Sequence, residues 1–261
     1  MVILAKKNKL LYNKKMNILI CNDDGIKSKS LHYLAKELSK KHNVLVIAPS
    51  KNRSGSAHSL TVCSKLKLKR YKKEKLNMYS LSGTPADCVK FANRVFTDFN
   101  IDLVISGINK GHNLGTDILY SGTLSAAIEG SVFGYKCFAF SCVSFLEDNL
   151  DFWVNKCQEI IEKLMPISKN GTIWNVNFPN VKVEEVKGIK FVPLGNHLYN
   201  DHYVKFGKNK FSLVGEPLEV IDNPPNCDVE CSRKGYITIT PILFDKTDYD
   251  KLKECESLWK R

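Results

Sequence analysis

The sequence lacks the short motifs that identify several common enzyme classes. No Gly-x-Gly-x-x-Gly follows its first apolar run, so the usual dinucleotide-binding fingerprint is missing. A Walker A lysine loop, a Gly-x-Ser-x-Gly nucleophile elbow and a His-Glu-x-x-His zinc motif are also absent. The sequence contains no repeats and no low-complexity tracts. These absences argue against the enzymes that depend on those motifs.

Long apolar runs and paired cysteine motifs are missing as well. No run approaches the roughly 18 residues that a membrane-spanning helix needs. The apolar start turns basic at Lys6 and Lys7, which reverses the order found in a secretory signal. The nine cysteines are an odd set without Cys-x-x-Cys or zinc-like spacing. We therefore expect buried thiols in a reducing cytoplasm and no membrane partner.

The net charge of +12 comes almost entirely from two segments. Residues 1–15 carry five lysines and no acid, and residues 65–75 carry seven basic residues against Glu74. The rest of the chain is close to neutral, which argues against nucleic acid as a partner. Alternation of lysine and leucine over 65–69 predicts a strand with leucines inward and lysines in solvent. Long-range attraction of phosphorylated substrates is the other role open to these lysines.

Length and periodicity predict one large α/β domain in this chain of 261 residues. A short apolar run at 17–21, helical spacing across 28–41 and a second apolar run at 44–48 form a β-α-β unit. Such a unit implies parallel strands joined by a right-handed crossover. Further strands are predicted near 78–81, 102–106, 137–143 and 172–178, and helices near 85–97, 123–134 and 149–165.

The two ends of the chain differ from this pattern. We predict a basic extension over residues 1–15, because the folded pattern begins at Met16. Residues 195–235 are rich in Gly, Asn, Pro and Tyr, which favours hairpins that return through a strand at 236–240. A final helix over about 247–259 carries an apolar stripe of Leu252, Cys255 and Trp259. That stripe either docks on its own domain or reaches a partner subunit.

Asp23 and Asp24 follow the first predicted strand directly. Ligands of open α/β sheets bind outside the carboxyl ends of the strands. Two adjacent acids there repel each other unless a cation or a proton intervenes. Mg²⁺ and Mn²⁺ favour such oxygen ligands. The alternative is an Asx turn or a helix cap formed by the same residues.

Three later segments also follow strands and should reach the same rim. They supply hydroxyls, amides, glycines and cations. Their members are Arg53 and Ser54, then Gly107, Asn109, Lys110 and Gly111, then Ser121, Gly122 and Thr123. The last group leads into a helix N-terminus, where free amides and the helix dipole favour an anion. For Ser121 and Thr123 the alternative is an ordinary helix N-cap.

A cation site flanked by amides, hydroxyls and basic side chains suits phosphoester hydrolysis. Asp87 is interpreted as a first-turn helix acid, and His58 and His112 as structural histidines. Two other functions stay open at this point. One is a module that binds RNA or polyphosphate without hydrolysis, and the other is a phosphatase with Asp23 or Asp24 as nucleophile.

The motifs taken together resemble the SurE family of metal-dependent survival-protein nucleotidases. The matching segments are Asn22-Asp23-Asp24-Gly25-Ile26, Ala48-Pro49, Asn52-Arg53-Ser54-Gly55, His58-Ser59-Leu60-Thr61, Gly83-Thr84-Pro85-Ala86-Asp87-Cys88-Val89-Lys90, Ser106-Gly107-Ile108-Asn109-Lys110-Gly111, Asn113-Leu114-Gly115, Tyr120-Ser121-Gly122-Thr123, Gly235-Tyr236 and Ile239-Thr240-Pro241. They span about residues 16 to 241. One departure is Ala57, where the family usually has glycine.

The resemblance implies a Rossmann-like α/β core over 16–261, with a mostly parallel sheet, a projecting β-hairpin and a C-terminal arm. The hairpin and the arm, over 195–261, would embrace another subunit in a homodimer or homotetramer. The implied activity is hydrolysis of nucleoside 5′-monophosphates to nucleoside and phosphate. Some members of the family also cleave 3′-nucleotides or short polyphosphate.

The resemblance also implies the residues of the site. One Mg²⁺ or Mn²⁺ per subunit would be held by Asp23, Asp24, Ser54 and Asn109, with Asp23 and Asp24 also catalytic. The phosphate and substrate would be bound by Asn22, Gly107, Lys110, Gly111, Ser121, Gly122 and Thr123.

Overall fold

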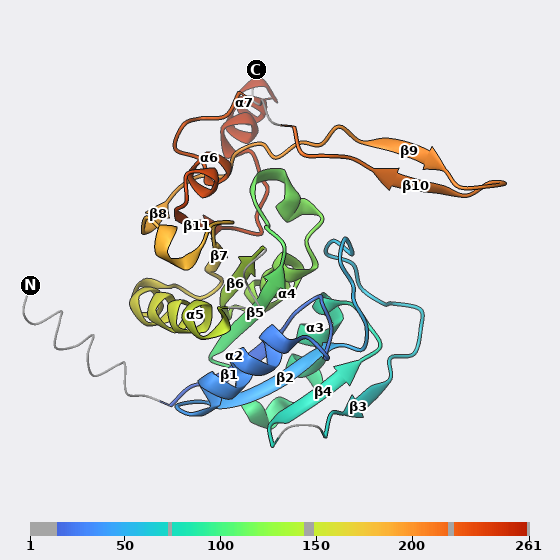
Figure 1. Cartoon of the computed structure of the whole chain (residues 1–261), viewed down its shortest axis with the longest axis vertical. Coiled ribbons are helices and arrows are strands. Elements are labelled where there is room, and N and C mark those ends of the chain that lie inside the picture. The colour runs from blue at the N-terminus through green and yellow to red at the C-terminus, as the bar shows by residue number, and fades with distance from the viewer. Residues whose placement is uncertain (1–14, 73–74, 144–148, 219–221, 260–261) are drawn as a thin grey trace, which may run out of the picture.

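A mixed sheet of nine strands forms the centre of the protein (Figure 1). The computed structural model describes residues 15–72, 75–143, 149–218 and 222–259. The strand order across the sheet is β3-β4-β2-β1-β5-β6-β7-β11-β8. Its strands are β1 (Asn17–Cys21), β2 (Asn43–Pro49), β3 (Leu68–Arg70), β4 (Asn77–Leu81), β5 (Leu103–Lys110), β6 (Lys136–Cys142), β7 (Ile173–Asn177), β8 (Ile189–Phe191) and β11 (Ile237–Ile242).

Six neighbouring strands of the sheet, in the spatial order β4-β2-β1-β5-β6-β7, run parallel. The short strand β3 is antiparallel to β4, and β11 is antiparallel to β7. The central strands are apolar on both faces, as expected for a parallel sheet covered by helices on each side. In β1, for example, Ile18, Leu19 and Ile20 are all fully buried.

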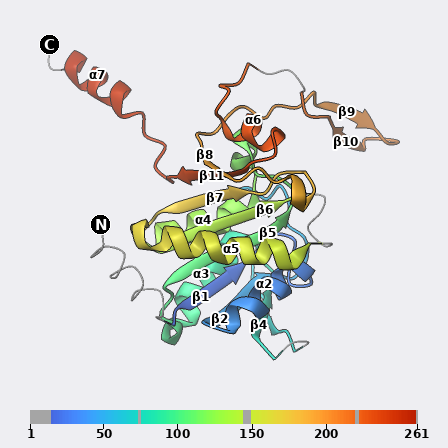
Figure 2. The ribbon, with the colours of Figure 1, turned by 60° about the vertical axis from the view of Figure 1, so that its left-hand side comes forward.

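Helices cover both faces of the sheet. The helices α2 (Lys29–Ser39) and α5 (Leu150–Leu164) lie on one face, and Figure 2 shows α5 running across it. There Trp153 packs against Phe178, with ring centroids 4.8 Å apart. The helices α3 (Pro85–Val95) and α4 (Gly122–Val132) cover the other face. The predicted Rossmann-like α/β architecture is confirmed.

The remaining helices and strands are short, apart from the last helix. The 3₁₀ helices are η1 (Thr97–Phe99), η2 (Gly115–Leu119), η3 (Met165–Ile167) and η4 (Val183–Glu185). The others are β9 (His202–Lys205), β10 (Phe211–Val214), α6 (Asp228–Arg233) and α7 (Tyr249–Trp259). The antiparallel pair β9 and β10 confirms the predicted hairpin. The predicted strand over 65–69 was wrong in extent, because only 68–70 pair with β4; Leu66 and Leu68 still pack inward between exposed lysines.

Two parts of the C-terminal third leave the body of the protein. The β9–β10 hairpin projects to one side (Figure 1), and α7 stands away from the sheet (Figure 2). None of the residues of α7 is buried, and Trp259 is 93% exposed. The predicted apolar stripe of α7 therefore does not dock on its own domain. Among the described residues, no helix is long and apolar enough to cross a membrane.

The packing of α5 on the sheet yields a first prediction. Trp153→Ala removes a fully buried ring and leaves a cavity between α5 and the sheet. We expect a loss of about 3–5 kcal/mol in the free energy of unfolding. The matched change Val95→Ala, at a position 54% exposed, should cost about 0.5 kcal/mol or less. Denaturant unfolding measures both, and a loss below about 1 kcal/mol for Trp153→Ala would contradict this packing.

Candidate active site

The candidate site lies where the strand order of the sheet reverses. From β1 the chain builds outward through β2 to β4, and then returns to the other side of β1 with β5, β6 and β7. The switch point is therefore the crevice between the carboxyl ends of β1 and β5, the usual ligand position in open α/β sheets. Asp23 and Asp24 follow β1, and Asn109 lies at the end of β5. The structure thus brings these three residues to one crevice, as predicted.

The turn after β1 is closed by Asn22. Its side-chain oxygen accepts a hydrogen bond from the Gly25 amide (3.1 Å), and its amide nitrogen donates to the Gly25 carbonyl (3.3 Å). Gly25 has a φ of 95°, and a Cβ there would lie 3.1 Å from the Pro49 carbonyl oxygen. The turn can therefore approach the end of β2 only with glycine at this position. The side chain that closes this turn is therefore that of Asn22, and the N-cap of α2 is Ser28, so neither Asp23 nor Asp24 caps that helix.

Asp23 is buried and bonded to the N-terminus of α4. The Thr123 hydroxyl donates to its carboxylate at 2.6 Å, and only 4% of Asp23 is exposed. Burial raises the pKa of Asp23, while hydrogen bonds from the side chain and backbone of Thr123 oppose that rise. A Cβ on Gly122 would lie 2.7 Å from the Asp23 Cβ. Glycine at 122 is therefore what lets α4 begin directly against Asp23.

Asp24 is more accessible and strongly perturbed. Its carboxylate accepts a hydrogen bond from the Lys110 amide at 3.3 Å, which ties it to the end of β5. Burial and the neighbouring charge of Asp23 raise the pKa of Asp24 to about 6, against the Lys110 charge and amide. Two partly desolvated carboxylates side by side favour either a shared proton or a bound cation.

An irregularity in β5 directly precedes Asn109. The pairing of β5 with β6 shifts register between Ser106 and Asn109, as in a β-bulge that redirects a side chain. Gly107 has a φ of 127°, and a Cβ there would lie 2.3 Å from the Phe140 carbonyl oxygen. The Asn109 amide nitrogen donates to the Gly111 carbonyl at 3.0 Å, so its side-chain oxygen is the atom left for a ligand.

The loop after β2 reaches the same crevice. The Arg53 amide donates to the Asp23 carbonyl at 2.7 Å, which holds this loop against the turn that carries the two acids, and Ser54 is the next, exposed residue. Ser56 was not singled out from the sequence, yet its hydroxyl is buried without a partner among the described residues. It lies 3.1 Å from the point where Gly122 would carry a Cβ, next to the Asp23 carboxylate. The residues next to Ser56, Asp23 and Gly122, are distant from it in the sequence, so a local sequence pattern does not reveal this contact.

The donor set fits a hard divalent cation. Two carboxylates, a hydroxyl and an amide oxygen are the ligand types that Mg²⁺ and Mn²⁺ favour. No three His, Cys, Asp or Glu side chains gather in a metal-ligating cluster within the described ranges, so neutral oxygens must complete any ion's shell. Burial raises the pKa of both Asp23 and Asp24, and the Ser56 hydroxyl beside Asp23 has no hydrogen-bond partner among the described residues.

The residues predicted to bind phosphate have definite structural roles. The Ser121 hydroxyl accepts the Leu124 amide at 3.0 Å, which confirms the N-cap alternative. Thr123 bonds to Asp23 and does not act as the cap. The Gly111 amide donates to the Cys142 carbonyl at 2.9 Å, and the Lys110 side chain is exposed. Contact of these residues with phosphate stays a prediction.

Three other polar residues have the structural roles expected for them. Asp87 forms a capping box with Thr84 at the start of α3. The His58 ring lies 2.9 Å from the Glu129 carboxylate. The His112 ring bonds the Phe178 carbonyl at 3.2 Å, and burial lowers the pKa of His112 to about 4. Of the nine cysteines, all free, Cys63 and Cys255 are exposed and the others are buried, so the expectation of buried thiols holds for seven.

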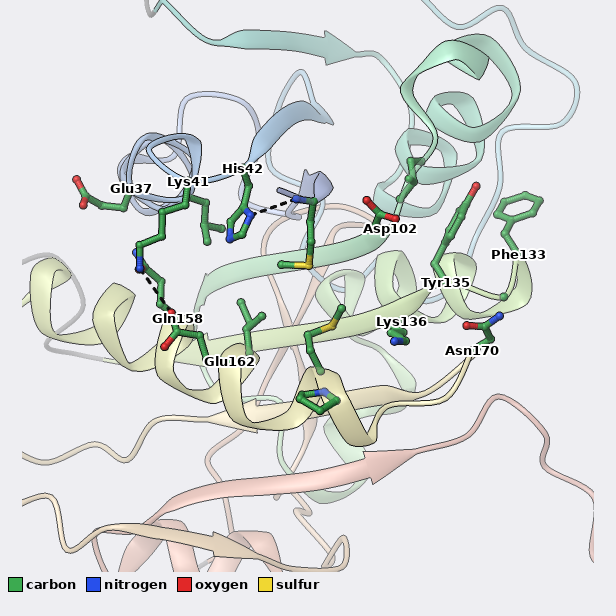
Figure 3. Close-up of a pocket in the computed structure, with 17 residues that line it drawn as sticks. Glu37, Lys41, His42, Asp102, Phe133, Tyr135, Lys136, Gln158, Glu162 and Asn170 are labelled. Carbon is green, nitrogen blue, oxygen red and sulfur yellow. Dashed lines mark hydrogen bonds and ion pairs between the residues drawn. The ribbon is translucent and has the colours of Figure 1, made fainter. Parts of the chain in front are cut away.

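A cavity of about 870 Å³ lies at the opposite, amino-end edge of the sheet (Figure 3). Its charged lining residues include Glu37, Lys41, Asp102, Lys136 and Glu162. Lys41 lies 3.6 Å from Glu162, and Asp102 accepts the Asn17 amide at 2.8 Å. The cavity is therefore remote from Asp23 and Asp24 and forms no part of the candidate site.

Comparison with known proteins agrees with this geometry. The family model described as survival protein SurE matches residues 18–201. The chain belongs to the SurE family. It is 41% identical to a protein named 5′-nucleotidase SurE from Caldanaerobacter subterraneus subsp. tengcongensis, over 94% of this chain and 98% of that one. A protein of the same name from Petrotoga mobilis is 40% identical, over 93% and 98%.

The fold is shared with a solved member of the SurE family. The crystal structure of SurE protein from Aquifex aeolicus superposes with a TM-score of 0.78 at 34% sequence identity. The match covers 92% of this chain and 98% of that chain. The agreement therefore extends beyond the segment that the family model matches.

The carboxylate pair yields a prediction about stability and pH. In the metal-free protein, Asp24 has a folded pKa of about 6 against an ordinary value of 3.8, so its charge opposes folding above pH 6. Asp24→Asn should therefore be more stable than the wild type at pH 8, by about 1–2 kcal/mol after allowance for solvent screening. The gap should narrow as the pH falls from about 6 toward 4, because the folded protein takes up its proton near pH 6 and the unfolded chain only near pH 4 and below.

Denaturant unfolding in the presence of a chelator measures this gap between pH 4 and pH 8. Asp98→Asn is the matched control, because Asp98 is exposed and stands apart from the pair. A metal-free Asp24→Asn protein that is no more stable than the wild type at pH 8 would contradict the repulsion inferred here.

Proposed function

We propose that this SurE-family protein is a metal-dependent 5′-nucleotidase that hydrolyses nucleoside 5′-monophosphates to nucleoside and phosphate. The observation that carries the proposal is the pair Asp23 and Asp24 at the switch point, with Asn109 at the end of β5 and Ser54 on the loop after β2. The two relatives described above bear the name 5′-nucleotidase SurE. Hydrolysis of 3′-nucleotides and short polyphosphate is proposed as a secondary activity.

The cation would be one Mg²⁺ or Mn²⁺ per chain, held by Asp23, Asp24, Ser54 and Asn109. When bound, it supplies charge neutralisation for phosphoryl oxygens and lowers the pKa of water at the site. Asp23 is suited to a fixed ligand, because the Thr123 hydroxyl holds its carboxylate in place at 2.6 Å. The amide nitrogen of Asn109 is bonded to Gly111, which leaves its side-chain oxygen available for the cation.

The chain's own groups would position the phosphate and move the proton. The N-terminus of α4, at Gly122, faces the crevice and favours an anion through its dipole. The Ser56 hydroxyl is free to donate to a phosphoryl oxygen, and the exposed Lys110 offers a cation. Asp24 is the base that we assign, because it is more accessible than Asp23.

We further propose a cytoplasmic homodimer or homotetramer assembled through the C-terminal third. The β9–β10 hairpin and α7 expose large apolar side chains that have no partner within the described chain. They include Tyr203, Phe206, Phe211, Leu213, Leu258 and Trp259. Exposed apolar side chains gathered on projecting elements of this kind are typical of protein interaction sites. A second copy of the chain is the partner proposed here.

The proposed activity predicts a strict dependence on Asp23. Asp23→Asn keeps the shape of the side chain and its hydrogen bond with Thr123 but removes a charged metal ligand. We expect phosphate release from nucleoside 5′-monophosphates with Mn²⁺ to fall by at least about 10³-fold. Asp98→Asn, which removes an exposed carboxylate, should keep activity within about twofold.

A phosphate-release assay measures this loss, and circular dichroism checks the fold of each variant. Full activity in Asp23→Asn, or in the wild type after chelation, would contradict the proposed mechanism. A trapped phosphoenzyme on Asp23 or Asp24 would instead favour the aspartyl-phosphate alternative.

The proposed assembly predicts a separate effect at α7. Trp259→Glu places a charge on the 93% exposed apolar end of this helix and should shift the protein toward smaller species. Light scattering coupled to gel filtration measures the mass of those species. Lys253→Gln, an exposed change on the same helix, is the control. A monomeric wild type, or an unchanged mass for Trp259→Glu, would contradict assembly through α7.

A further inference from the structure

The loop over residues 52–62 depends on distant side chains for its position. It joins β2 to β3, forms no helix or strand, and carries Ser54 and Ser56 to the crevice. Near the crevice, the Arg53 amide bonds the Asp23 carbonyl at 2.7 Å and the Ala57 amide bonds the Tyr120 carbonyl at 3.1 Å. Hydroxyl ligands on an irregular loop need further support to hold a fixed position.

Glu129 provides the first distant attachment. This residue lies on α4, and only 3% of it is exposed. One carboxylate oxygen accepts a hydrogen bond from His58 of the 52–62 loop at 2.9 Å, and the other accepts one from Lys90 of α3 at 2.6 Å. Lys90 in turn lies over the Phe133 ring, 5.2 Å from its centroid. The pair of Glu129 with Lys90 joins two helices, whereas the bond with His58 acts only on the loop.

Asp87 provides the second attachment, at the other end of the loop. Its carboxylate accepts the Thr61 amide at 3.0 Å and the Thr61 hydroxyl at 2.6 Å. The Thr84 hydroxyl, at the N-cap of α3, also donates to the Ser59 carbonyl at 2.7 Å. A first-turn acid needs only its own helix amides, so the two bonds to Thr61 exceed what capping α3 requires.

One helix therefore holds both sides of the crevice. Thr123, in the first turn of α4, fixes Asp23, and Glu129 lies six residues later, about 9 Å along the helix axis. Through His58, Glu129 sets the loop that presents Ser54. Asp23 and Ser54, two proposed ligands of one ion, lie on separate segments. Both segments are thus held in place by hydrogen bonds to the same helix, α4.

We propose that Glu129, acting through His58, and Asp87, acting through Thr61, are positioning residues that place Ser54 at the metal site. This inference rests on the proposed function, because it concerns the cation proposed there. Neither Glu129 nor Asp87 contacts the cation in this scheme. Both act by holding the 52–62 loop in a fixed position. Loss of such outer support commonly weakens metal affinity by about 10–100-fold.

The test separates the bond to the loop from the bond between the helices. His58→Ala removes only the loop attachment and leaves Glu129 paired with Lys90. It should weaken Mn²⁺ binding to the full-length protein about tenfold, measured by calorimetry without substrate. His58→Gln restores a side-chain N–H donor and should recover most of the affinity. Lys90→Met breaks the other half of the Glu129 pair and should change Mn²⁺ affinity by less than about twofold.

Asp87 has its own pair of variants. Thr61→Val keeps the shape of the side chain and removes the hydroxyl that bonds Asp87, so it should also weaken Mn²⁺ binding several-fold. Ser39→Ala removes a hydroxyl of the partly exposed Ser39 on α2 that donates to the Lys36 carbonyl, far from the crevice, and it should leave Mn²⁺ affinity unchanged. Denaturant unfolding of each metal-free variant gives its loss in the free energy of unfolding. This loss is compared with the loss in the free energy of Mn²⁺ binding for the same variant.

The outcomes distinguish this inference from the proposed function. Equal losses of Mn²⁺ affinity in His58→Ala and Lys90→Met, or no rescue by His58→Gln, would overturn the positioning role. Either result would leave the proposed function standing, because the wild type would still bind Mn²⁺ through Asp23. A wild type that binds no Mn²⁺, or an Asp23→Asn variant that binds it normally, would overturn the proposed function and the positioning role with it.

Discussion

The hydrogen bond from the Thr123 hydroxyl to the Asp23 carboxylate connects the two halves of the fold. Asp23 belongs to the first β-α-β unit, and Thr123 opens the helix that follows the fifth strand, 100 residues later in the sequence. The bond holds a buried acid at the positive end of a helix dipole, which partly offsets the cost of removing its charge from water. Asp24, with less support, keeps a pKa near 6. The negative charge of the two carboxylates is thus only partly offset by hydrogen bonds and the helix dipole, which favours a cation in the crevice.

The helix α4 gives this arrangement its rigidity. Small residues let it approach its neighbours closely, since a Cβ at Gly130 would lie 2.8 Å from the Cys137 sulfur and 3.0 Å from a Val104 methyl group. Its first turn meets Asp23 through Gly122 and Thr123. A helix packed this tightly against the sheet transmits any displacement directly to the site. Both ends of α4 therefore require small residues, because Gly122 lies against Asp23 and Gly130 lies against the sheet.

The sequence predicted the parts of the fold and the site that depend on local patterns. The apolar runs and helical spacing located the central strands and the four helices that cover them. The acids after β1 could be assigned to the rim because the carboxyl ends of parallel strands share one edge of a sheet. The glycine that the family usually has in place of Ala57 also has a structural reason, since the φ of Ala57 is 48°, a region that favours glycine.

Features that depend on long-range partners could not be predicted in this way. Glu129 looked like one more residue of a helix, because its partner His58 is 71 residues away in the sequence. The unpaired hydroxyl of Ser56 depends on the approach of Gly122. The helix α6 has six residues and β8 has three, which is too short for periodicity to identify.

Anomalous diffraction from crystals grown with Mn²⁺ tests the central claim most directly. The account predicts one strong anomalous peak per chain, within about 2.5 Å of oxygens from Asp23, Asp24, Ser54 and Asn109. The absence of a peak at the crevice, or an ion bound with Ser54 and Asn109 turned away from it, would contradict the account.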